Sequence, residues 1–448
     1  MLIANRGEIA VRVIRTLHEL GIEAVAVYST ADHGTLHTRM ADRAICIGPP
    51  PAAESYLAIP SVIAAAQTAG CDAIHPGYGF LAENPAFVRA CDDNGVVFIG
   101  PGADVMEEMG DKVRAKAAMT AAGVPVVPGT DGVATAADAL AAAGELGYPV
   151  LLKAAAGGGG KGMRLVSSPS ELEETYQTAS VEALAAFGDG RVYVEKALVP
   201  ARHVEVQVLA DGEGNVLTMG ERECSIQRRH QKLVEESPSP ALTPERREEM
   251  EAAAERACRA VGYANAGTFE FLVGPDGDFH FIELNARLQV EHPVSELVTG
   301  IDLVAEQVRV AAGEALSATG RAARGGHAIE VRLNAEDPAA GFAPSPGRVT
   351  RFRPPLGPFD RVDTHLEDGT EVPSYYDSLL AKLVVWGTDR QNAIARCRRA
   401  LGELEIEGVC TTRELAIDIM RSDAFVTGAY STSFLDDAAA VLPAMGGR

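Results

Sequence analysis

The chain has 448 residues, of which 62 are acidic and 40 basic, so its formal net charge is −22 at pH 7. This charge argues against a nucleic-acid partner. No apolar run reaches the roughly 18 to 20 residues of a membrane span, and the first residues lack the features of a signal peptide. The seven cysteines contain no CxxC pair, so neither a zinc site nor a disulfide framework is indicated. These features predict a cytoplasmic protein of two or three domains that does not bind membranes.

The first 110 residues alternate short apolar strands with amphipathic helices. We expect strands at 2–4, 25–28, 44–47, 73–74 and 96–99, and helices at 8–20, 60–69 and 85–93. This alternation predicts an open parallel α/β sheet. The stretch 75–83 follows the end of a strand, where such sheets place ligands. A plain tight turn is the alternative for that stretch.

A hairpin is predicted at residues 267–285, where two strand-like runs flank Asp276-Gly277. A turn centred on that pair places Glu270 opposite Glu283, and Thr268 opposite Asn285. Side chains alternate with period two, so we expect Glu270, Leu272, Phe281, Glu283 and Asn285 to share one face. Two opposed carboxylates repel each other, and a divalent cation such as Mg²⁺ would turn that repulsion into a binding site. The alternative is an acidic hairpin face in water.

Only seven of the basic residues are lysines, and 33 are arginines. A lysine ammonium is a compact charge suited to phosphate oxygens, and arginine is not its equivalent. Functional positions are therefore expected among the lysines that lie in motifs, which are Lys112, Lys153, Lys196 and Lys232. The other three, Lys116, Lys161 and Lys382, lie in less telling surroundings, and Lys382 is inside an apolar run that predicts a strand.

A glycine-rich loop at 157–162 joins two predicted strands, at 150–154 and 163–166. It fits GxGxxG, but a dinucleotide site needs a helix after the loop, and no Ser or Thr follows Gly160-Lys161 as Walker A requires. The remaining interpretation is a loop whose backbone N–H groups close over phosphates, with Lys153 nearby. A hairpin tip without function is the alternative.

The charged run at 221–232 is interpreted either as a solvated segment or as a site whose anion contact is Lys232. Cys224 is discounted as a nucleophile, because Glu221 and Glu223 disfavour a thiolate. His203 lies on an alternating strand with Glu205 and Gln207 on its face, and a structural role is as well supported as a functional one. Arg332 lies on a predicted strand at 327–338, and an edge-strand arginine in water is the alternative there.

Residues 283–293 read Glu-Leu-Asn-Ala-Arg-Leu-Gln-Val-Glu-His-Pro, which resembles the active-site segment of biotin carboxylase, an ATP-grasp enzyme. The match extends from Asn5-Arg-Gly-Glu-Ile9 to Tyr375-Tyr-Asp-Ser378. The resemblance implies a mixed α/β and α+β fold of three domains. These are an N-terminal open parallel α/β sheet (1–110), an ATP-grasp module (111–320) with a mobile lid near 127–198, and a C-terminal mixed α+β domain (321–448) that closes with helices at 389–404 and 412–422.

The resemblance also implies the reaction, which is ATP-dependent carboxylation of biotin with bicarbonate through carboxyphosphate, giving carboxybiotin, ADP and phosphate. It is the first half-reaction of an acyl-CoA carboxylase such as acetyl- or propionyl-CoA carboxylase. The implied catalytic residues are Glu291 as general base, Arg332 at the biotin ureido oxygen, Lys232 and Arg287. Bicarbonate and biotin would contact Arg287, Gln289, Val290, Tyr78 and Arg332. Glu270, Glu283 and Asn285 would hold Mg²⁺ or Mn²⁺. ATP would contact Lys112, Lys153, Gly158, Gly159, Gly160, Met163, Glu195, Lys196, Leu198, His203, Gln227, His230 and Leu272.

The implied partners are a biotin carboxyl carrier protein or domain, a carboxyltransferase subunit, and a second copy of the chain in a homodimer. The family's carriers hold their biotinylated lysine between methionines, and no Met-Lys pair occurs here. We therefore expect the biotin to be carried by a separate partner.

Two other function classes are considered. One is another ATP-grasp ligase that joins a carboxylate to an amine, and the other is a nucleotide-binding regulatory module without turnover. The acyl-CoA that is finally carboxylated is not predicted.

Overall fold

The computed structural model describes residues 1–448 except 131, 155–162, 230, 439–441 and 447–448. The N-terminal strands are β1 (Leu2–Ile3), β2 (Val25–Ser29), β3 (Arg43–Gly48), β4 (Ala73–His75) and β5 (Val97–Phe98). They form one sheet in the order β3-β2-β1-β4-β5, in which every pairing is parallel. The accompanying helices are α1 (Gly7–Glu19), α2 (Leu36–Met40), α3 (Ile59–Ala69) and α4 (Pro85–Asp93), with short 3₁₀ turns η1 (Thr30–Asp32) and η2 (Ala52–Glu54). The predicted open parallel α/β sheet is confirmed.

Helix α1 illustrates how the sequence sets these elements. Ile9, Val13 and Leu17 recur one turn apart and are fully or almost fully buried, as expected for the inward stripe of an amphipathic helix. The helix stops just before Gly21, which has a φ of +70°. Glycine adopts that left-handed conformation without the steric cost that a side chain would bring. The predicted helix end is confirmed.

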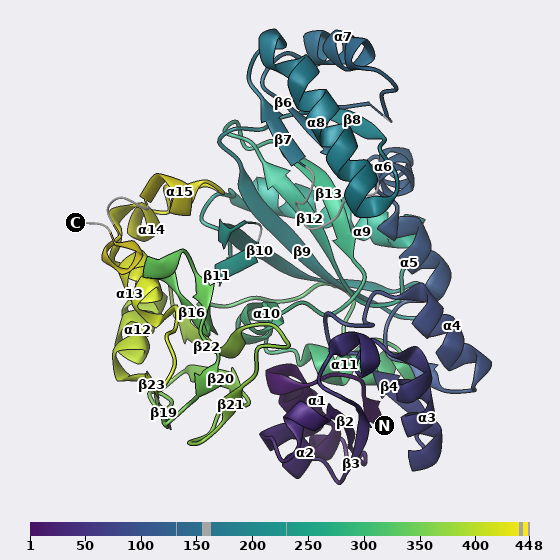
Figure 1. Ribbon diagram of the computed structural model, residues 1–448, viewed down its shortest axis with the longest axis vertical. Coiled ribbons are helices and arrows are strands. Elements are labelled where there is room, and N and C mark those ends of the chain that lie inside the picture. The colour runs from purple at the N-terminus through teal and green to yellow at the C-terminus, as the bar shows by residue number, and fades with distance from the viewer. Residues whose placement is uncertain (131, 155–162, 230, 439–441, 447–448) are drawn as a thin grey trace.

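Two helices, α5 (Ala103–Gly110) and α6 (Lys112–Ala121), lead to a small separate layer at the top of Figure 1. Its strands are β6 (Val150–Ala154), β7 (Met163–Val166) and β8 (Val192–Lys196), in the antiparallel order β7-β6-β8. Helices α7 (Ala136–Leu146) and α8 (Pro169–Phe187) pack on it. This unit has its own apolar core, which includes Ala143, Leu152 and Val194. It lies within the region where the sequence analysis expects a lid.

A large sheet forms the centre of the molecule. Its strands are β9 (Arg202–Ala210), β10 (Val216–Arg228), β11 (Gln231–Ser237), β12 (Asn265–Val273), β13 (Phe279–Asn285), β14 (Gly320–Arg321), β15 (His327–Asn334), β20 (Asp360–Thr364) and β22 (Leu379–Gly387). The order is β13-β12-β9-β10-β11-β15-β22-β20, with β14 beside β10. Strand β11 pairs antiparallel with β15, so one sheet carries both Lys232 and Arg332. Helices α9 (Pro244–Ala260), α10 (His292–Thr299) and α11 (Leu303–Ala311) lie between these strands in the sequence.

The predicted hairpin is present, with one correction. Glu270 pairs with Glu283 and Thr268 with Asn285, as the turn at Asp276-Gly277 predicted. The register then shifts, so that Phe271 pairs with Phe281. Phe281 is 1% exposed and packs with Phe269 and Phe271 in the core, away from the carboxylates. The prediction that Phe281 shares the face of Glu270 was wrong, because a β-bulge adds one residue to β13 and reverses the facing of the residues before it.

The C-terminal region adds a second core between the sheet and the closing helices. The helices are α12 (Arg390–Glu403), α13 (Arg413–Arg421), α14 (Asp423–Thr427) and α15 (Phe434–Ala438), with 3₁₀ turns η3 (Pro338–Ala340) and η4 (Pro443–Met445). Short two-stranded pairings connect β16 (Glu336–Asp337) with β17 (Ala343–Pro344), β18 (Gly347–Arg348) with β21 (Glu371–Val372), and β19 (Arg351–Arg353) with β23 (Glu405–Glu407). The mixed C-terminal architecture and its two main closing helices are confirmed. Among the described residues, no helix has both the length and the apolar character of a membrane span.

Candidate functional site

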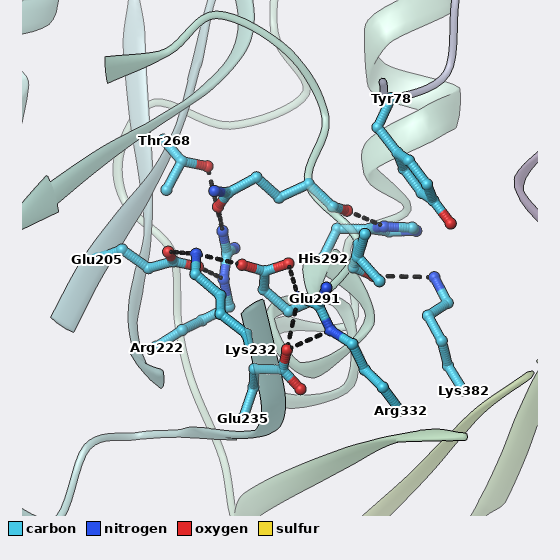
Figure 2. A network of polar contacts seen from close by, with 12 residues as sticks. Tyr78, Glu205, Arg222, Lys232, Glu235, Thr268, Glu291, His292, Arg332 and Lys382 are labelled. Atoms are coloured by element: carbon cyan, nitrogen blue, oxygen red, sulfur yellow. Dashed lines mark hydrogen bonds and ion pairs between the residues drawn. The ribbon is translucent and has the colours of Figure 1, made fainter. Parts of the chain in front are cut away.

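Lys232 lies at the centre of a buried cluster of charges (Figure 2). Its Nζ atom is 2.5 Å from Glu205, 2.6 Å from Glu291 and 2.9 Å from Glu270. Burial alone would lower the pKa of Lys232, but the surrounding carboxylates raise it well above its usual value. A buried charge is stable only with such partners. Lys232 is therefore a permanent ammonium that draws three carboxylates to one point.

Glu291 is shared between two cations that come from neighbouring strands. One of its carboxylate oxygens accepts from Lys232, and the other accepts from the Arg332 guanidinium at 2.8 Å. Glu291 is the residue before α10, yet its side chain does not cap that helix. Burial alone would raise the pKa of Glu291, but Lys232 and Arg332 hold it well below its usual value. The carboxylate is thus ionised and aimed at the two cations.

Arg332 joins this centre to a further acid that the sequence analysis missed. Its Nε atom donates to Glu235 at 2.6 Å. Burial raises the pKa of Glu235 to about 7, although Arg332 opposes the shift. Glu235 lies on β11, next to the β15 strand of Arg332, and pairs in register with Glu330. Arg332 is consequently held by two carboxylates and is only partly exposed, not an edge-strand arginine in water.

A second residue that the sequence analysis missed, Arg222, donates hydrogen bonds to members of this cluster. It is fully buried and donates to Glu205 (2.6 Å), to Gln289 (2.7 Å) and to side-chain oxygens of Gln207, Ser295 and Thr268. The alternative interpretation of this segment as a solvated run is therefore wrong for residues 221–226, which are buried. A usable signal existed, because the alternating strand 202–208 carries Glu205, which lies opposite Arg222 across β9 and β10.

Cys224 lies in the same buried run. Burial and the nearby Glu205 raise the pKa of its thiol well above the usual value. A thiol of that kind is a poor nucleophile, because the reactive form is the thiolate. The geometry thus agrees with the sequence argument against a catalytic Cys224.

The paired acids Glu270 and Glu283 face each other across β12 and β13. Glu270 accepts from Asn285 at 2.8 Å and from Gln289 at 2.7 Å, and His203 Nε2 lies 2.9 Å away. Burial and the charge of Glu270 raise the pKa of Glu283. A cation between them would remove that repulsion, so the pair fits a hard divalent ion with oxygen ligands. Within the described part of the chain, His203, Glu205 and Glu270 also place ligand atoms within 4.8 Å of one another.

A second polar centre lies where the small upper layer meets α6. The Glu195 carboxylate on β8 is bonded to Lys153 on β6 and, at 2.6 Å, to Lys116 on α6. Lys116 had been given no role, although it is one helical turn from Lys112, and side chains at that spacing share a face. Burial lowers the pKa of Lys112, and the carboxylate of Glu283 opposes this. Helix α6, which begins at Lys112, packs against β13, the strand that carries Glu283.

The remaining predicted nucleotide contacts are more scattered. The ammonium of Lys196 donates to the backbone oxygens of Gly147 and Tyr148 and does not join Glu195. Leu272 on β12 lies opposite His203 on β9. Gln227 on β10 lies opposite Lys232 on β11, and Met163 on β7 lies opposite Lys153 on β6. Leu198 follows the end of β8. Gly158, Gly159, Gly160 and His230 lie outside the described residues.

The predicted bicarbonate and biotin contacts surround the loop before α10. Arg287 donates to Glu83 at 2.7 Å and to Asn285 at 3.1 Å, and Gln289 joins Glu270 to Arg222. Glu83 had been given no role of its own, although it ends the stretch 75–83 that was predicted to approach a ligand. The Tyr78 hydroxyl donates to Glu8, and its ring lies beside Lys382. Residues from all three regions of the chain thus meet around one loop.

Three protein-family models match the chain in succession. "Biotin carboxylase, N-terminal domain" matches residues 1–106, "Carbamoyl-phosphate synthase L chain, ATP binding domain" matches 111–319, and "Biotin carboxylase C-terminal domain" matches 330–437. Among curated proteins, the biotin carboxylase of Nostoc sp. is 52% identical and the alignment covers 98% of both chains. A pyruvate carboxylase subunit of Methanothermobacter thermautotrophicus is 53% identical, with 98% of this chain and 89% of that protein covered.

Solved structures agree with these matches. The biotin carboxylase of Campylobacter jejuni, in a complex with a nucleotide, superposes with a TM-score of 0.94 at 50% identity, covering 97% of this chain and 98% of that one. The biotin carboxylase domain dimer of Hydrogenobacter thermophilus 2-oxoglutarate carboxylase, which contains MgADP, ADP and bicarbonate, gives 0.93 at 48% identity and covers 98% of each chain.

Proposed function

Because the chain belongs to the biotin carboxylase family, it is an ATP-dependent ligase that carboxylates biotin with bicarbonate, and we propose that the charge cluster around Lys232 is its catalytic centre. The observation that carries this proposal is the position of Glu291 between Lys232 and Arg332. Family membership argues against the two alternatives, a generic carboxylate–amine ligase and a module without turnover. Neither of those would need a carboxylate and a guanidinium held together at this place.

Bicarbonate would bind around the loop before α10. Lys232, Arg287, Gln289 and the backbone of Val290 offer donors, and a guanidinium suits a planar anion. Glu291 would take the bicarbonate proton as general base, since it is ionised and buried. Once protonated, Glu291 no longer neutralises Lys232, and that ammonium becomes available to the anion that forms. When the carboxylate of Glu291, which has a low pKa, takes up the proton, the positive charge of Lys232 can thus stabilise the reacting oxygen.

ATP would be held between the small upper layer and the hairpin. Lys112, Lys153 and the glycine loop would contact its phosphates, and the residues 195–198 together with His203, Gln227, His230, Met163 and Leu272 would surround the rest. Glu270, Glu283 and Asn285 would hold Mg²⁺ or Mn²⁺, whose charge neutralises the phosphate oxygens during transfer. The raised pKa of Glu283 supports this fit. The lid, at about 127–198, would close and keep water from the carboxyphosphate.

Biotin would bind beside Tyr78 and Arg332. Carboxyphosphate would break down into CO₂ and phosphate, and that phosphate would take the ureido N–H proton. Arg332 would stabilise the enolate-like oxygen that this leaves, while the ureido nitrogen forms its bond to the CO₂. Glu291 and Glu235 both hold Arg332 in the structure described above. Protonation of Glu291 in the first step would remove one of these two ion pairs. Arg332 would then be free to contact biotin in the second step.

The domain division 1–110, 111–320 and 321–448 and the wider assembly are part of the same proposal. We infer a cytoplasmic homodimer that serves a separate biotin carboxyl carrier and an acyl-CoA carboxyltransferase. A 2-oxo acid is the competing final acceptor, because the Methanothermobacter pyruvate carboxylase subunit has 53% identity to this chain. Supplying carboxylated carrier to an acyl-CoA carboxyltransferase and to a pyruvate carboxyltransferase would distinguish the two acceptors.

The test uses the 448 residues purified from cells that make biotin ligase. We expect ADP release that requires both bicarbonate and biotin, slow carboxylation of free biotin, no label on a streptavidin blot and no carboxylation of an acyl-CoA by these residues on their own. Bicarbonate-free buffer is the control. ADP release without biotin at the full rate would contradict the assignment, and a biotinylated chain would contradict the separate carrier.

A further inference from the structure

Lys382 is a buried lysine that the reaction described above does not use. It lies on β22 within an apolar run and is 0% exposed. Its Nζ atom donates to the backbone oxygen of Val290 at 2.9 Å (Figure 2), and it lies 3.3 Å from Glu8 and 3.7 Å from Asp363. These partners come from α1, from the loop before α10 and from β20. One ammonium therefore ties together the three regions of the chain that the three family models match.

The register of the sheet gives this contact a direct relation to the site. Lys382 pairs with Arg332 of β15 on one side and with Asp363 of β20 on the other. Side chains that are opposite each other on adjacent strands leave the same face of a sheet. Val290, whose oxygen Lys382 holds, directly precedes Glu291. A single hydrogen bond thus links the strand pair that carries Arg332 to the loop that carries Glu291.

We propose that Lys382 is a positioning residue, which fixes the loop Gln289–Glu291 at the correct distance from Arg332 and so shapes the bicarbonate pocket. It touches no reacting atom in this role and acts through the Val290 backbone. The inference rests on the proposed assignment of Gln289, Val290 and Glu291 to bicarbonate.

The chemistry of the site explains why this position is a lysine. Burial alone would lower the pKa of Lys382, but the carboxylates of Glu8, Glu330 and Asp363 raise it. The group therefore stays charged, donates a hydrogen bond to one carbonyl and forms ion pairs with two carboxylates. Arginine accounts for 33 of the 40 basic residues, but its planar fork is not the equivalent of a compact ammonium that contacts oxygens of three different residues.

The test measures steady-state carboxylation of free biotin by Lys382→Met, which keeps the length and apolar body of the side chain. We expect the KM for bicarbonate to rise roughly 10- to 100-fold, because small displacements of a positioned group have effects of that size. The KM for ATP should stay within about twofold, since the nucleotide contacts lie on other elements. A purely structural role would lower the fraction of active protein, and thus kcat, without changing the bicarbonate KM.

Arg398→Met is the matched control. Arg398 also donates to a buried backbone oxygen, that of Met420, but between α12 and α13. It should leave both KM values unchanged. If Lys382→Met fails to fold, the double variant with Glu8→Gln is used, because Glu8 would otherwise be left as a buried carboxylate without its cation. Asp363 needs no such change, since its ion pair with Arg361 at 2.7 Å remains.

The outcomes separate this inference from the proposed function. Wild-type protein without bicarbonate-dependent ADP release would reject the function itself. Active wild-type protein together with an unchanged bicarbonate KM in a folded Lys382 variant would overturn the positioning role alone. Failure of both variants to fold would also overturn it, because Lys382 would then be a residue of the fold and not of the pocket.

Discussion

The guanidinium of Arg332 lies 2.8 Å from a carboxylate oxygen of Glu291, although 41 positions separate the two residues in the chain. This contact joins the strand at the proposed biotin side to the loop at the proposed bicarbonate side. It also means that one proton on Glu291 changes the charge balance of both half-sites. In the proposed mechanism, the two steps of the reaction would therefore be coupled through a single carboxylate.

Glu291→Gln and Arg332→Ala should each reduce biotin carboxylation by roughly two to four orders of magnitude, while ATP binding stays close to that of the wild type. The polar partners of these two side chains are Lys232, Glu235 and each other, whereas the proposed phosphate contacts lie on other elements. Carboxylation is measured as biotin-dependent ADP release, and ATP affinity by isothermal titration calorimetry. Arg353→Ala, which removes an exposed ion pair with Asp368, is the control. A loss of ATP affinity as large as the loss of rate would count against these roles.

Glu283→Gln should raise the Mg²⁺ concentration needed for half-maximal ADP release by roughly tenfold or more, because it removes one charged oxygen ligand and keeps the shape. The raised pKa of Glu283 adds a pH effect. Protons compete with the metal for a carboxylate of high pKa, so the Mg²⁺ requirement of the wild type should increase as the pH falls.

The control for this metal prediction is Glu249→Gln, an exposed acid that pairs with Arg246. Mg²⁺ titrations of ADP release at two pH values check both parts of the prediction. An unaltered Mg²⁺ requirement in Glu283→Gln would show that the opposed carboxylates do not share a cation.

Glu236 should contribute stability that depends on pH. His327 lies 2.6 Å from its carboxylate and Arg390 donates to both oxygens. Burial alone would raise the pKa of Glu236, but His327 and Arg390 lower it to about 2 from 4.5. A carboxyl with a lowered folded-state pKa stabilises the fold above its unfolded pKa. That contribution is lost as the pH falls from about 4.5 through about 2.

Glu236→Gln should therefore lower the free energy of unfolding by about 3 kcal/mol at pH 7. The difference from the wild type should shrink toward pH 2, where the wild-type carboxyl is protonated as well. Urea unfolding at pH 7 and pH 3 measures it, with Glu249→Gln as the exposed counterpart. A difference that is the same at both pH values would be inconsistent with a lowered pKa at Glu236.

Much of the fold could be predicted because its signals are local. The parallel βα region, helix α1 with its end at Gly21, and the pairing of Glu270 with Glu283 all follow from periodicity, caps and turn residues. The hairpin prediction failed only at Phe281. An inserted bulge residue has no sequence signal of its own, and packing of Phe269, Phe271 and Phe281 in the core decides where it occurs.

The candidate site divides in the same way. The motifs single out Lys232, Glu291 and Arg332. They leave a solvated run as one of two interpretations for the segment that contains Arg222, and they place Lys382 in an apolar strand. A charged residue in a strand is either exposed to solvent or buried, and the neighbouring sequence is similar in both cases. Only the partner across the sheet distinguishes them.

The sequence by itself thus determined the elements, the hairpin that opposes two carboxylates and the family to which the chain is similar, because these depend on neighbours a few residues apart. The tertiary structure decided which charges meet. Arg222 is buried because Glu205 and Gln289 are there to accept from it, and Lys382 because Val290, Glu8 and Asp363 surround it. A charge can leave water only when several partners converge on it, and that convergence is a property of the folded chain.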